Sequence, residues 1–288
     1  MFKLAILGCE NSHAKTFLGP IREGKYPELS VVGVYSNEPE AARALHEEFG
    51  TPVMERYDEL VGKVDALIVT ARHGDNHYKY AKPYLASGIP MFIDKPFTCT
   101  EEDGEALLRE ARANGVKLCG GSICATLPET LELASLVKEG TVGELRGGAL
   151  ACPLYIDSPY GGFFFYAQHL VDIMTKVFGE GVRAVRAVRM GDGVTLTARY
   201  DSFCVTGTYA EGLPYYGVSV YGAKATETRC LTFPADIFCR EVDDLLALLH
   251  GEPMKKSYES LLLPVYIMNA VTRSLESGVW EDVHTLSV

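Results

Sequence analysis

Residues 89–96 read Ile89-Pro90-Met91-Phe92-Ile93-Asp94-Lys95-Pro96. A short apolar segment that ends in an acid, a lysine and a proline is typical of a buried strand in a parallel sheet. Such a strand delivers its terminal side chains to the carboxyl edge of the sheet, where open α/β folds bind ligands. Because Pro96 restricts the backbone of Lys95, we expect this lysine to be held in place. The alternative is an ordinary strand end with a solvated lysine.

The residues around this strand indicate alternating strands and helices. Strands are predicted at residues 4–7, 29–35, 66–70, 89–93 and 116–119. Helices are predicted at residues 12–23, 39–49, 75–87 and 100–114. Helices of this length between buried strands imply a parallel, doubly wound sheet. We therefore predict a Rossmann-like dinucleotide-binding domain over residues 1–120.

The second half of the chain has a different pattern. Helices are predicted at residues 128–138, 165–178, 241–250 and 257–277, and β segments at 182–190, 194–200, 203–210, 217–221 and 228–233. Apolar and polar residues alternate strictly over residues 194–200, which indicates an antiparallel sheet with one buried face. We predict an α+β domain over residues 121–288 with a large, mostly antiparallel open sheet. This domain is expected to bind the substrate and to form a homodimer or homotetramer through its sheet.

Composition excludes several functional classes. Lysine and arginine number 27 against 38 acidic residues, which gives a net charge of −11, and no basic cluster suggests nucleic-acid binding. No apolar run approaches the roughly 20 residues needed to span a bilayer. Eight cysteines are scattered without a Cys-x-x-Cys pair, a pattern that favours reduced thiols in a cytoplasmic protein. The expected partner is a small-molecule substrate, with no nucleic acid and no membrane.

The turn after the first strand reads Gly8-Cys9-Glu10-Asn11-Ser12-His13. Dinucleotide-binding folds carry the glycine pattern Gly-x-Gly-x-x-Gly here, so that backbone amides approach the pyrophosphate. Only the first glycine is present. Glu10 adds bulk and negative charge where the pyrophosphate would lie, and Ser36-Asn37 replaces the acid expected after the second strand. By themselves, these residues give only a weak indication of nucleotide binding.

The chain as a whole resembles the Gfo/Idh/MocA oxidoreductases, a family typified by glucose–fructose oxidoreductase and inositol dehydrogenase. Thr70, His77, Leu85 and Gly88 lead into Asp94-Lys95-Pro96, which is similar to the Glu-Lys-Pro motif of the family. Further segments match in order: Gly140–Leu145, Gly161-Gly162 followed by His169 and Asp172, Phe238, Gly251-Glu252-Pro253, Asn269-Ala270 and Ser274–Gly278.

The resemblance implies a dehydrogenase that uses NAD or NADP and acts on sugars, polyols or related hydroxy compounds. Lys95 would lie near the nicotinamide and the reacting hydroxyl, and His169 would be the acid/base, for which the pKa of histidine is well suited. Asp172 shares a helix face with His169 and would orient it. The expected cofactor-binding residues are Gly8, Glu10, Asn11, Ser12, His13, Ser36, Asn37, Thr70, His73, His77, Asp94, Lys95 and Pro96. For His169, the alternative is a helix histidine that caps or packs.

The predicted substrate pocket contains Lys95, Phe165, Tyr166 and His169. The family often has an aspartate where this chain has Phe165, so the set of catalytic groups is partial. An aromatic wall would suit a flatter or more apolar substrate than a simple sugar. No metal site is predicted, because the spacing of Glu10, His13, His73 and His77 matches no metal motif.

Two hypotheses remain open from the sequence. The first is a working NAD(P)-dependent oxidoreductase with an atypical pyrophosphate loop, which Lys95 and the pair His169 and Asp172 favour. The second is a non-catalytic sensor or accessory protein that binds a small molecule on the same scaffold, which Glu10, His13 and Phe165 favour.

Overall fold

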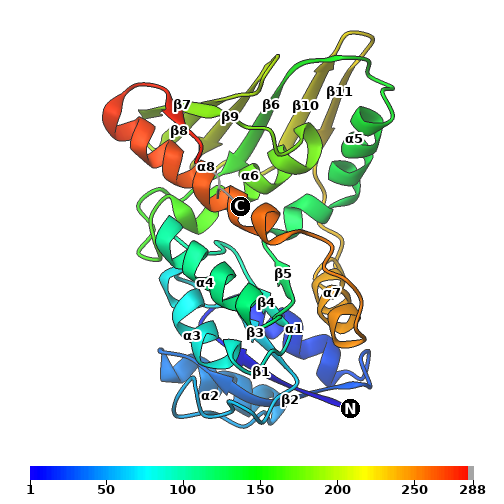
Figure 1. Ribbon diagram of the computed structural model, residues 1–288, viewed down its shortest axis with the longest axis vertical. Helices are drawn as coiled ribbons and strands as arrows, with labels where there is room; N and C mark the ends of the chain where they lie inside the picture. Colours follow the sequence, from blue (N-terminus) through cyan, green and yellow to red (C-terminus); the bar gives the residue numbers. More distant parts are fainter. Residues whose placement is uncertain (285–288) are drawn as a thin grey trace. The chain divides into compact units, whose positions relative to one another are not determined.

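The computed structural model describes residues 1–284, which fall into two compact units (Figure 1). Of the described residues, the first unit contains 1–121 and 235–261, and the second contains 122–234 and 262–284. The prediction that everything after residue 120 forms the second domain is therefore wrong for residues 235–261. This segment contains α7 (Cys239–Leu249), whose apolar side chains Cys239, Val242 and Leu245 share a core with Leu4 and Ile6 of the first strand.

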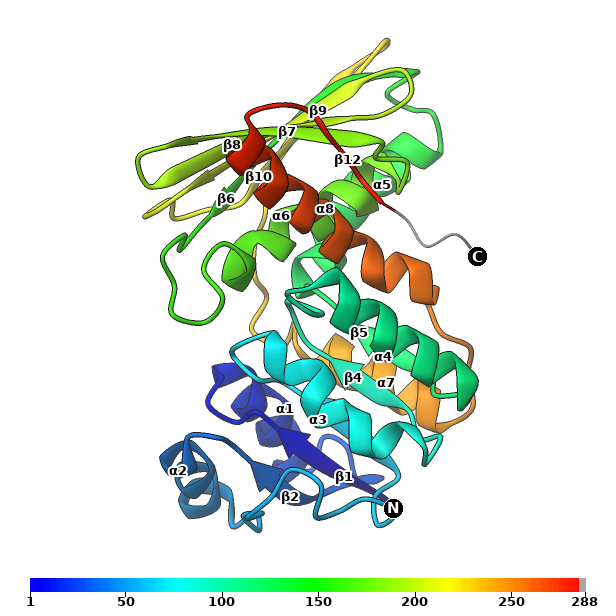
Figure 2. The same cartoon turned by 60° about the vertical axis from the view of Figure 1, so that its left-hand side comes forward.

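The first unit has a five-stranded parallel sheet in the order β2-β1-β3-β4-β5, as expected for a Rossmann-like fold. Its strands are β1 (Phe2–Leu7), β2 (Leu29–Tyr35), β3 (Ala66–Val69), β4 (Met91–Ile93) and β5 (Leu118–Gly120). The helices between them are α1 (Ser12–Arg22), α2 (Pro39–Phe49), α3 (Asp75–Leu85) and α4 (Glu101–Ala113). Figures 1 and 2 show α3 and α4 on one face of this sheet and α1 and α7 on the other.

The buried strands explain why the first unit was predictable. Every residue of β3 and β4 is buried, and a strand covered on both faces reads as a continuous apolar run. β4 pairs in parallel with β3 and with β5. Asp94 and Lys95 therefore follow a central strand and lie at the carboxyl edge of the sheet, as the sequence predicted.

The second unit has a seven-stranded sheet in the order β11-β10-β6-β9-β8-β7-β12. Its strands are β6 (Leu145–Pro153), β7 (Ala184–Met190), β8 (Gly193–Arg199), β9 (Cys204–Ala210), β10 (Gly217–Gly222), β11 (Thr226–Cys230) and β12 (Glu281–Asp282). β6 and β9 run parallel, whereas the other neighbours are antiparallel. The predicted mostly antiparallel sheet is confirmed, and Val194, Leu196 and Ala198 of β8 form its buried row.

The central strand β6 was not among the predicted strands, because glycines and alanines hide its alternation. Gly148 has a packing reason: a Cβ atom at this position would lie 2.2 Å from the ring of Phe178. Phe178 ends α6 (Phe164–Phe178), which therefore packs directly on the sheet. The other helices of this part of the chain are the 3₁₀ helix η1 (Ile123–Thr126), α5 (Pro128–Lys138) and α8 (Tyr258–Ser277). Within residues 1–284, no helix combines the length and the apolar character that a membrane span requires.

Candidate active site

The turn between β1 and α1 packs closely against the loop after β3. Gly8 has a φ angle of +95°, and a Cβ atom there would lie 2.2 Å from the backbone nitrogen of Ala71. Thr70 is fully buried and donates a hydrogen bond from its hydroxyl to the Gly8 carbonyl at 3.2 Å. Only glycine fits such a conformation and such a close approach. The first glycine of the fingerprint is thus required by the fold, and Thr70 serves to fix the turn.

The side chain of Glu10 turns toward the end of β2. Its Oε2 atom accepts a hydrogen bond of 2.6 Å from the Ser36 hydroxyl, and its Oε1 atom accepts one of 3.0 Å from the Arg72 backbone amide. The Arg72 guanidinium in turn donates to the Glu10 carbonyl. Glu10, from the turn after β1, therefore places a carboxylate at the end of β2, where the sequence itself has no acid. Asn37 lies beside this pair and is exposed.

His13 and Asp94 connect the start of α1 to the end of β4. His13 Nδ1 lies 2.7 Å from Asp94 Oδ2, and the Asn11 side-chain amide donates to the same oxygen at 3.4 Å. Asn11 also caps α1 by accepting a hydrogen bond from the His13 amide, whereas Ser12 is exposed. Burial alone would raise the pKa of Asp94, but the charge and hydrogen bond of His13 and the charge of Lys95 lower it to about 2. Asp94 is thus an ionised anchor for this helix.

Lys95 is held at the end of β4, with a side chain only 5% exposed. Its backbone amide donates to Asp94 Oδ1 at 2.7 Å, and the following Lys95–Pro96 peptide is cis. Glu241 of α7 is also buried, and its Oε2 atom makes no hydrogen bond. Burial and the charges of Asp94 and Asp244 raise the pKa of Glu241 well above its usual value, against the opposing effect of Lys256 and Lys95. Lys95 thus belongs to a buried group of charged side chains.

Glu241 was missed in the sequence, although a signal was present. It shares a helical face with Leu245 and Leu248 at positions i, i+4 and i+7, and all three are buried. A carboxylate in such an apolar row is costly to bury unless it has a partner or keeps its proton. This conflict between residue type and position marks Glu241 as a member of the site.

His77 is fully buried, and we assign it to the framework of the site. Its Nε2 atom lies 2.8 Å from the Ala71 carbonyl and its Nδ1 atom 3.3 Å from the Phe97 carbonyl. Burial lowers its pKa more than the nearby Asp94 raises it, so the ring is held neutral. His77 thereby connects the loop after β3 with the loop that carries Lys95. Among the described residues, Glu10, His13, His73 and His77 form no common cluster, since each has separate partners.

A second group of polar side chains surrounds His169 on α6. The Ser122 hydroxyl lies 2.6 Å from His169 Nδ1, and the Cys124 thiol lies 3.5 Å from the same nitrogen. Asp172 accepts hydrogen bonds from the Ser122 backbone amide at 2.6 Å and from the Gln168 side chain at 3.1 Å. Asp172 therefore fixes Ser122, which in turn contacts His169. Asp172 is thus linked to His169 through Ser122, and its orienting role stays a prediction.

Phe165 and Tyr166 precede His169 and have different neighbours. The Tyr166 ring packs edge-on against His169 with a centroid distance of 5.1 Å, and burial raises the pKa of its phenol. Phe165 packs against Tyr160 and also lies edge-on to Tyr166, with a centroid distance of 5.3 Å. Phe165 borders a cavity of about 340 Å³ whose lining is aromatic and acidic, formed by Tyr155, Asp157, Ser158, Pro159, Tyr160, Phe165 and Glu211. Tyr166 thus contacts both His169 and Phe165, and Phe165 lines this cavity.

Four further residues that lie around Asp172 or His169 were not predicted. They are Ser122, Cys124, Gln168 and Tyr216. Tyr216 approaches His169 with a ring centroid distance of 5.9 Å. In the sequence, Ser122 shows only a capping pattern, and its hydroxyl does accept the Cys124 amide at the start of η1. Nothing local to residues 120–126 indicates a contact with a helix more than 40 residues later. Such a contact depends on how the second unit folds.

In the comparison with known proteins, the family match falls within the first 122 residues of the chain. Residues 2–122 match the model of an oxidoreductase family described as having an NAD-binding Rossmann fold. The dTDP-3,4-didehydro-2,6-dideoxy-alpha-D-glucose 3-reductase of Actinomadura kijaniata is 26% identical over 149 residues, which are 51% of this chain and 44% of that protein. The UDP-N-acetylglucosamine 3-dehydrogenase of Acidithiobacillus ferrooxidans is 31% identical over 143 residues, 49% of this chain and 41% of that protein. The matches thus span less than half the length of these relatives.

The fold of the whole chain is also found among solved structures. The scyllo-inositol dehydrogenase of Lactobacillus casei, solved with NAD(H) and scyllo-inositol, matches 98% of this chain and 99% of its own with a TM-score of 0.85. The sequences are 15% identical, so this likeness concerns the fold.

Proposed function

We propose that the protein is an NAD(P)-dependent oxidoreductase of the Gfo/Idh/MocA type, because residues 2–122 match the model of an oxidoreductase family with an NAD-binding Rossmann fold. The proposed reaction transfers hydride between the nicotinamide and the hydroxyl-bearing carbon of a sugar, polyol or related compound. The observation that carries the proposal is the placement of Lys95. Its side chain is buried at the carboxyl edge of β4, in the sheet of the matched domain.

The altered glycine loop is compatible with a dinucleotide. Gly8 keeps the tight turn, and the two bulky replacements are engaged in internal contacts, Glu10 with Ser36 and His13 with Asp94. The start of α1 retains the partial positive charge that favours a pyrophosphate. When bound, the cofactor would supply the hydride acceptor or donor. The loop would hold it through Gly8, Asn11 and Ser12.

We further propose that NAD is preferred over NADP. A carboxylate at the end of β2 bonds the ribose hydroxyls in folds of this type, and it repels a 2′-phosphate. Glu10 places its carboxylate there, beside Ser36. A carboxylate has about four lone-pair positions, and the described contacts to Ser36 and Arg72 use two of them. Glu10 would therefore take the place of the acid that is missing from β2.

In the proposed reaction, Lys95 places its positive charge beside the oxygen on the reacting carbon of the substrate. This oxygen has alkoxide character during hydride transfer. A preorganised cation in a water-poor site stabilises such charge strongly. Asp94 stays ionised because its pKa is about 2, and it fixes the Lys95 amide. The chain thus orients Lys95 through its backbone and balances its charge with a buried carboxylate.

His169 is the proposed acid/base that exchanges the hydroxyl proton. Its Nδ1 atom is engaged by Ser122, which fixes the ring and directs Nε2 to the other side. Asp172 holds Ser122 in turn. Lys95 and His169 lie in different units, and their action on one substrate is part of this proposal.

The test is a titration of the purified protein with NADH and NADPH, followed by nicotinamide fluorescence and thermal shift. We expect saturable, micromolar binding of NADH that weakens at least about tenfold in Lys95→Ala, since a buried charged contact contributes about 1.5–3 kcal/mol. Lys79→Ala, at an exposed position of the same unit, should bind like the wild type. Absence of binding at millimolar NADH and NADPH would refute the proposal.

A second candidate is a sensor or accessory protein that binds a small molecule without catalysis. The observation in its favour is Phe165, which stands where the family often has an acid and borders the cavity next to Tyr160. The two candidates separate in an assay of NAD⁺ reduction with a panel of polyols, sugars and nucleotide sugars. Turnover that His169→Gln abolishes supports the enzyme, whereas NADH binding without turnover of any panel member supports the sensor.

Location and assembly complete the proposal. We propose a cytoplasmic protein, because the eight cysteines all lie among the described residues and none of them forms a disulfide. We also propose a homodimer or homotetramer through the seven-stranded sheet. Light scattering on a size-exclusion column measures the assembly directly, and a monomer at micromolar concentration would contradict it.

A further inference from the structure

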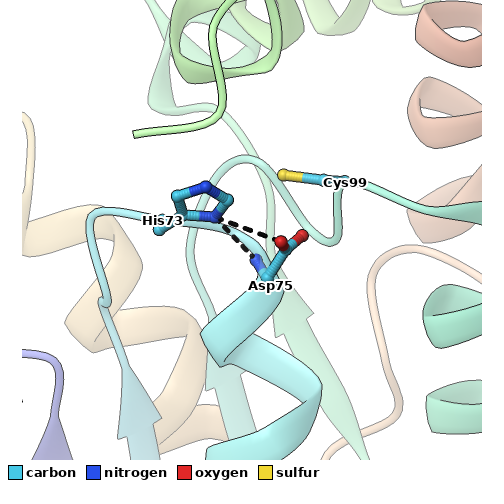
Figure 3. Close-up of side chains that lie close together, drawn as sticks. All are labelled: His73, Asp75 and Cys99. Atoms are coloured by element: carbon cyan, nitrogen blue, oxygen red, sulfur yellow. Dashed lines mark hydrogen bonds and ion pairs between the residues drawn. The ribbon is translucent and has the colours of Figure 1, made fainter. Parts of the chain in front are cut away.

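His73, Asp75 and Cys99 converge at the edge of the first unit, although 26 positions separate the first from the last (Figure 3). His73 lies in the loop after β3, Asp75 begins α3, and Cys99 lies in the loop between β4 and α4. One ligand atom from each side chain lies within 4.8 Å of the other two. Figure 3 shows the His73 ring and the Asp75 carboxylate side by side, with Cys99 beside them.

Gly74 permits this convergence. A Cβ atom at Gly74 would lie 2.9 Å from the Cys99 sulfur and 2.7 Å from the Pro96 ring. Real Cβ atoms essentially never come so close, so any side chain here would push the two loops apart. The missing side chain between His73 and Asp75 is what places both of them next to Cys99. The cluster therefore depends on a specific packing of two loops, each anchored at the end of a buried strand.

The direct contacts between His73 and Asp75 are long. The Asp75 backbone amide donates to His73 Nδ1 at 3.3 Å, and the Asp75 carboxylate lies 3.6 Å from the same nitrogen. Strong charge-assisted hydrogen bonds are shorter, about 2.7–2.9 Å. The Asp75 carboxylate is also hydrogen-bonded to the Cys99 thiol, so an ion bound here would take the place of that thiol proton.

The three groups form a recognised type of ligand set. Imidazole nitrogen, carboxylate oxygen and thiolate sulfur suit zinc and similar transition metal ions, whereas magnesium and calcium prefer oxygen ligands alone. Three protein ligands with water as the fourth is a common arrangement for tetrahedral zinc. Metal–ligand bonds of about 2.0–2.3 Å place tetrahedral ligands roughly 3.3–3.8 Å apart. Small side-chain rotations would therefore close the present spacing around an ion.

We propose that His73, Asp75 and Cys99 bind one divalent transition metal ion, zinc in preference to magnesium or calcium. Binding would release the thiol proton to solvent, because the thiolate is the ligand. The bound ion would fasten the loop after β3 to the loop that follows Lys95-Pro96. The loop carrying Lys95 would then be more rigid in the metal-bound protein. His73 is also one of the residues expected to bind the cofactor, but metal binding at these three side chains does not require bound nicotinamide.

Cobalt(II) is the probe for the test, because a cobalt–thiolate bond gives a charge-transfer absorption that an oxygen or nitrogen ligand does not. The titration uses chelator-treated, reduced protein without nicotinamide, in a background where the exposed Cys204 and Cys230 are replaced by serine. We expect the band to saturate at one equivalent of cobalt and to disappear when one equivalent of zinc is added. Excess magnesium should leave it unchanged.

The matched variant is Cys99→Ser, which keeps the size of the side chain and removes the thiolate. We expect it to lose the charge-transfer band, and we expect His73→Ala to lower the cobalt affinity at least about tenfold. Cys239→Ser, another buried cysteine of the same unit, should keep both the band and the affinity. The proposal is overturned if no band saturates at one equivalent, or if the band persists in Cys99→Ser with an unchanged far-ultraviolet circular dichroism spectrum. Either result leaves NADH binding, measured separately, to decide the proposed function.

Discussion

The Glu10 carboxylate accepts a hydrogen bond of 2.6 Å from the Ser36 hydroxyl, so the turn after β1 delivers a negative charge to the end of β2. If this charge selects against a 2′-phosphate, Glu10→Gln should reduce the preference for NADH over NADPH by about tenfold, equivalent to 1.4 kcal/mol. The measurement is the ratio of the two dissociation constants, obtained by nicotinamide fluorescence at constant ionic strength.

Glu47→Gln is the control for this prediction, because it removes an acid from an exposed position of α2 in the same unit. Its ratio of dissociation constants should stay within about twofold of the wild-type ratio, since exposed charges interact weakly through water. A Glu10→Gln protein with the wild-type ratio would show that Glu10 has only a structural role. Equal loss of both cofactors would lead to the same conclusion.

Gly8 and Gly24 offer a matched pair for testing the close approach of two loops. Both have positive φ angles, +95° and +81°, but a Cβ atom meets the Ala71 backbone only at Gly8 and has open space at Gly24. Gly24→Ala should cost about 1–2 kcal/mol through its backbone conformation alone. Gly8→Ala should cost more, about 3 kcal/mol or above, because backbone atoms must also move. Urea unfolding of both variants measures the difference.

The result for Gly8→Ala separates two reasons for the first glycine. A cost equal to that of Gly24→Ala would show that the loop after β3 adapts without strain. In that case, the first glycine of the fingerprint would be required by the cofactor and not by the fold.

The sequence predicts a structural feature of this protein where that feature depends on residues close together in the chain. The C-terminal end of β4 and the position of Lys95 follow from an apolar run and a proline, which are local features, whereas the strand begins at Met91 and not at Ile89. The orientation of Glu10 is not local, because its partner Ser36 belongs to another strand. For this reason, the sequence predicted a negative charge on the pyrophosphate path, whereas the structure places that charge at the end of β2.

The surroundings of His169 show the same limit. The helix and the position of His169 on it follow from periodicity and from the family motif. Ser122 reaches His169 from a part of the chain 47 positions earlier, and no local signal indicates its contact with Asp172, which accepts a hydrogen bond from its backbone amide. Glu241 combines a local signal with a non-local one. Its helix was predicted, but its return to the first unit depends on the path of the chain after β11.

Ser122 provides a test of the relay to His169. Ser122→Ala removes the hydroxyl that lies 2.6 Å from His169 Nδ1, so the ring loses its fixed orientation. We expect the rate of hydride transfer to fall about 10- to 100-fold, as is typical for partners that orient a functional histidine. The KM for NADH should not change. Ser122→Thr, which keeps a hydroxyl, should recover part of the rate.

A readout that does not depend on turnover comes from the His169 ring itself. Its ring-nitrogen chemical shifts, followed by NMR against pH, should differ between the wild type and Ser122→Ala, because the tautomer depends on the partner of Nδ1. Ser135→Ala, at an exposed site of α5, should leave the shifts unchanged. Identical titration curves for the wild type and Ser122→Ala would exclude Ser122 as a positioning residue.

The protonation of Glu241 makes the free energy of unfolding depend on pH. Burial and the neighbouring Asp94 and Asp244 raise its pKa in the folded protein well above the value in the unfolded chain, about 4.3. A raised pKa means that the folded state holds the proton more tightly. The associated stability is therefore fully present below about pH 4 and is lost as pH rises toward the folded pKa. Glu241→Gln has no proton to release and escapes this loss.

We therefore expect the free energies of unfolding of Glu241→Gln and the wild type to agree within about 0.5 kcal/mol at pH 4. At pH 7 the variant should be more stable by about 1–3 kcal/mol, the usual cost of an unsatisfied buried polar group. Urea unfolding at pH 4, 5.5 and 7 measures the trend, with Glu252→Gln, an exposed acid of the same unit, as the control. A constant difference across this range would mean that Glu241 is ionised in the folded protein. Lys95 would then have a buried carboxylate as its counter-ion, and Glu241→Gln should weaken NADH binding by changing the charge around that lysine.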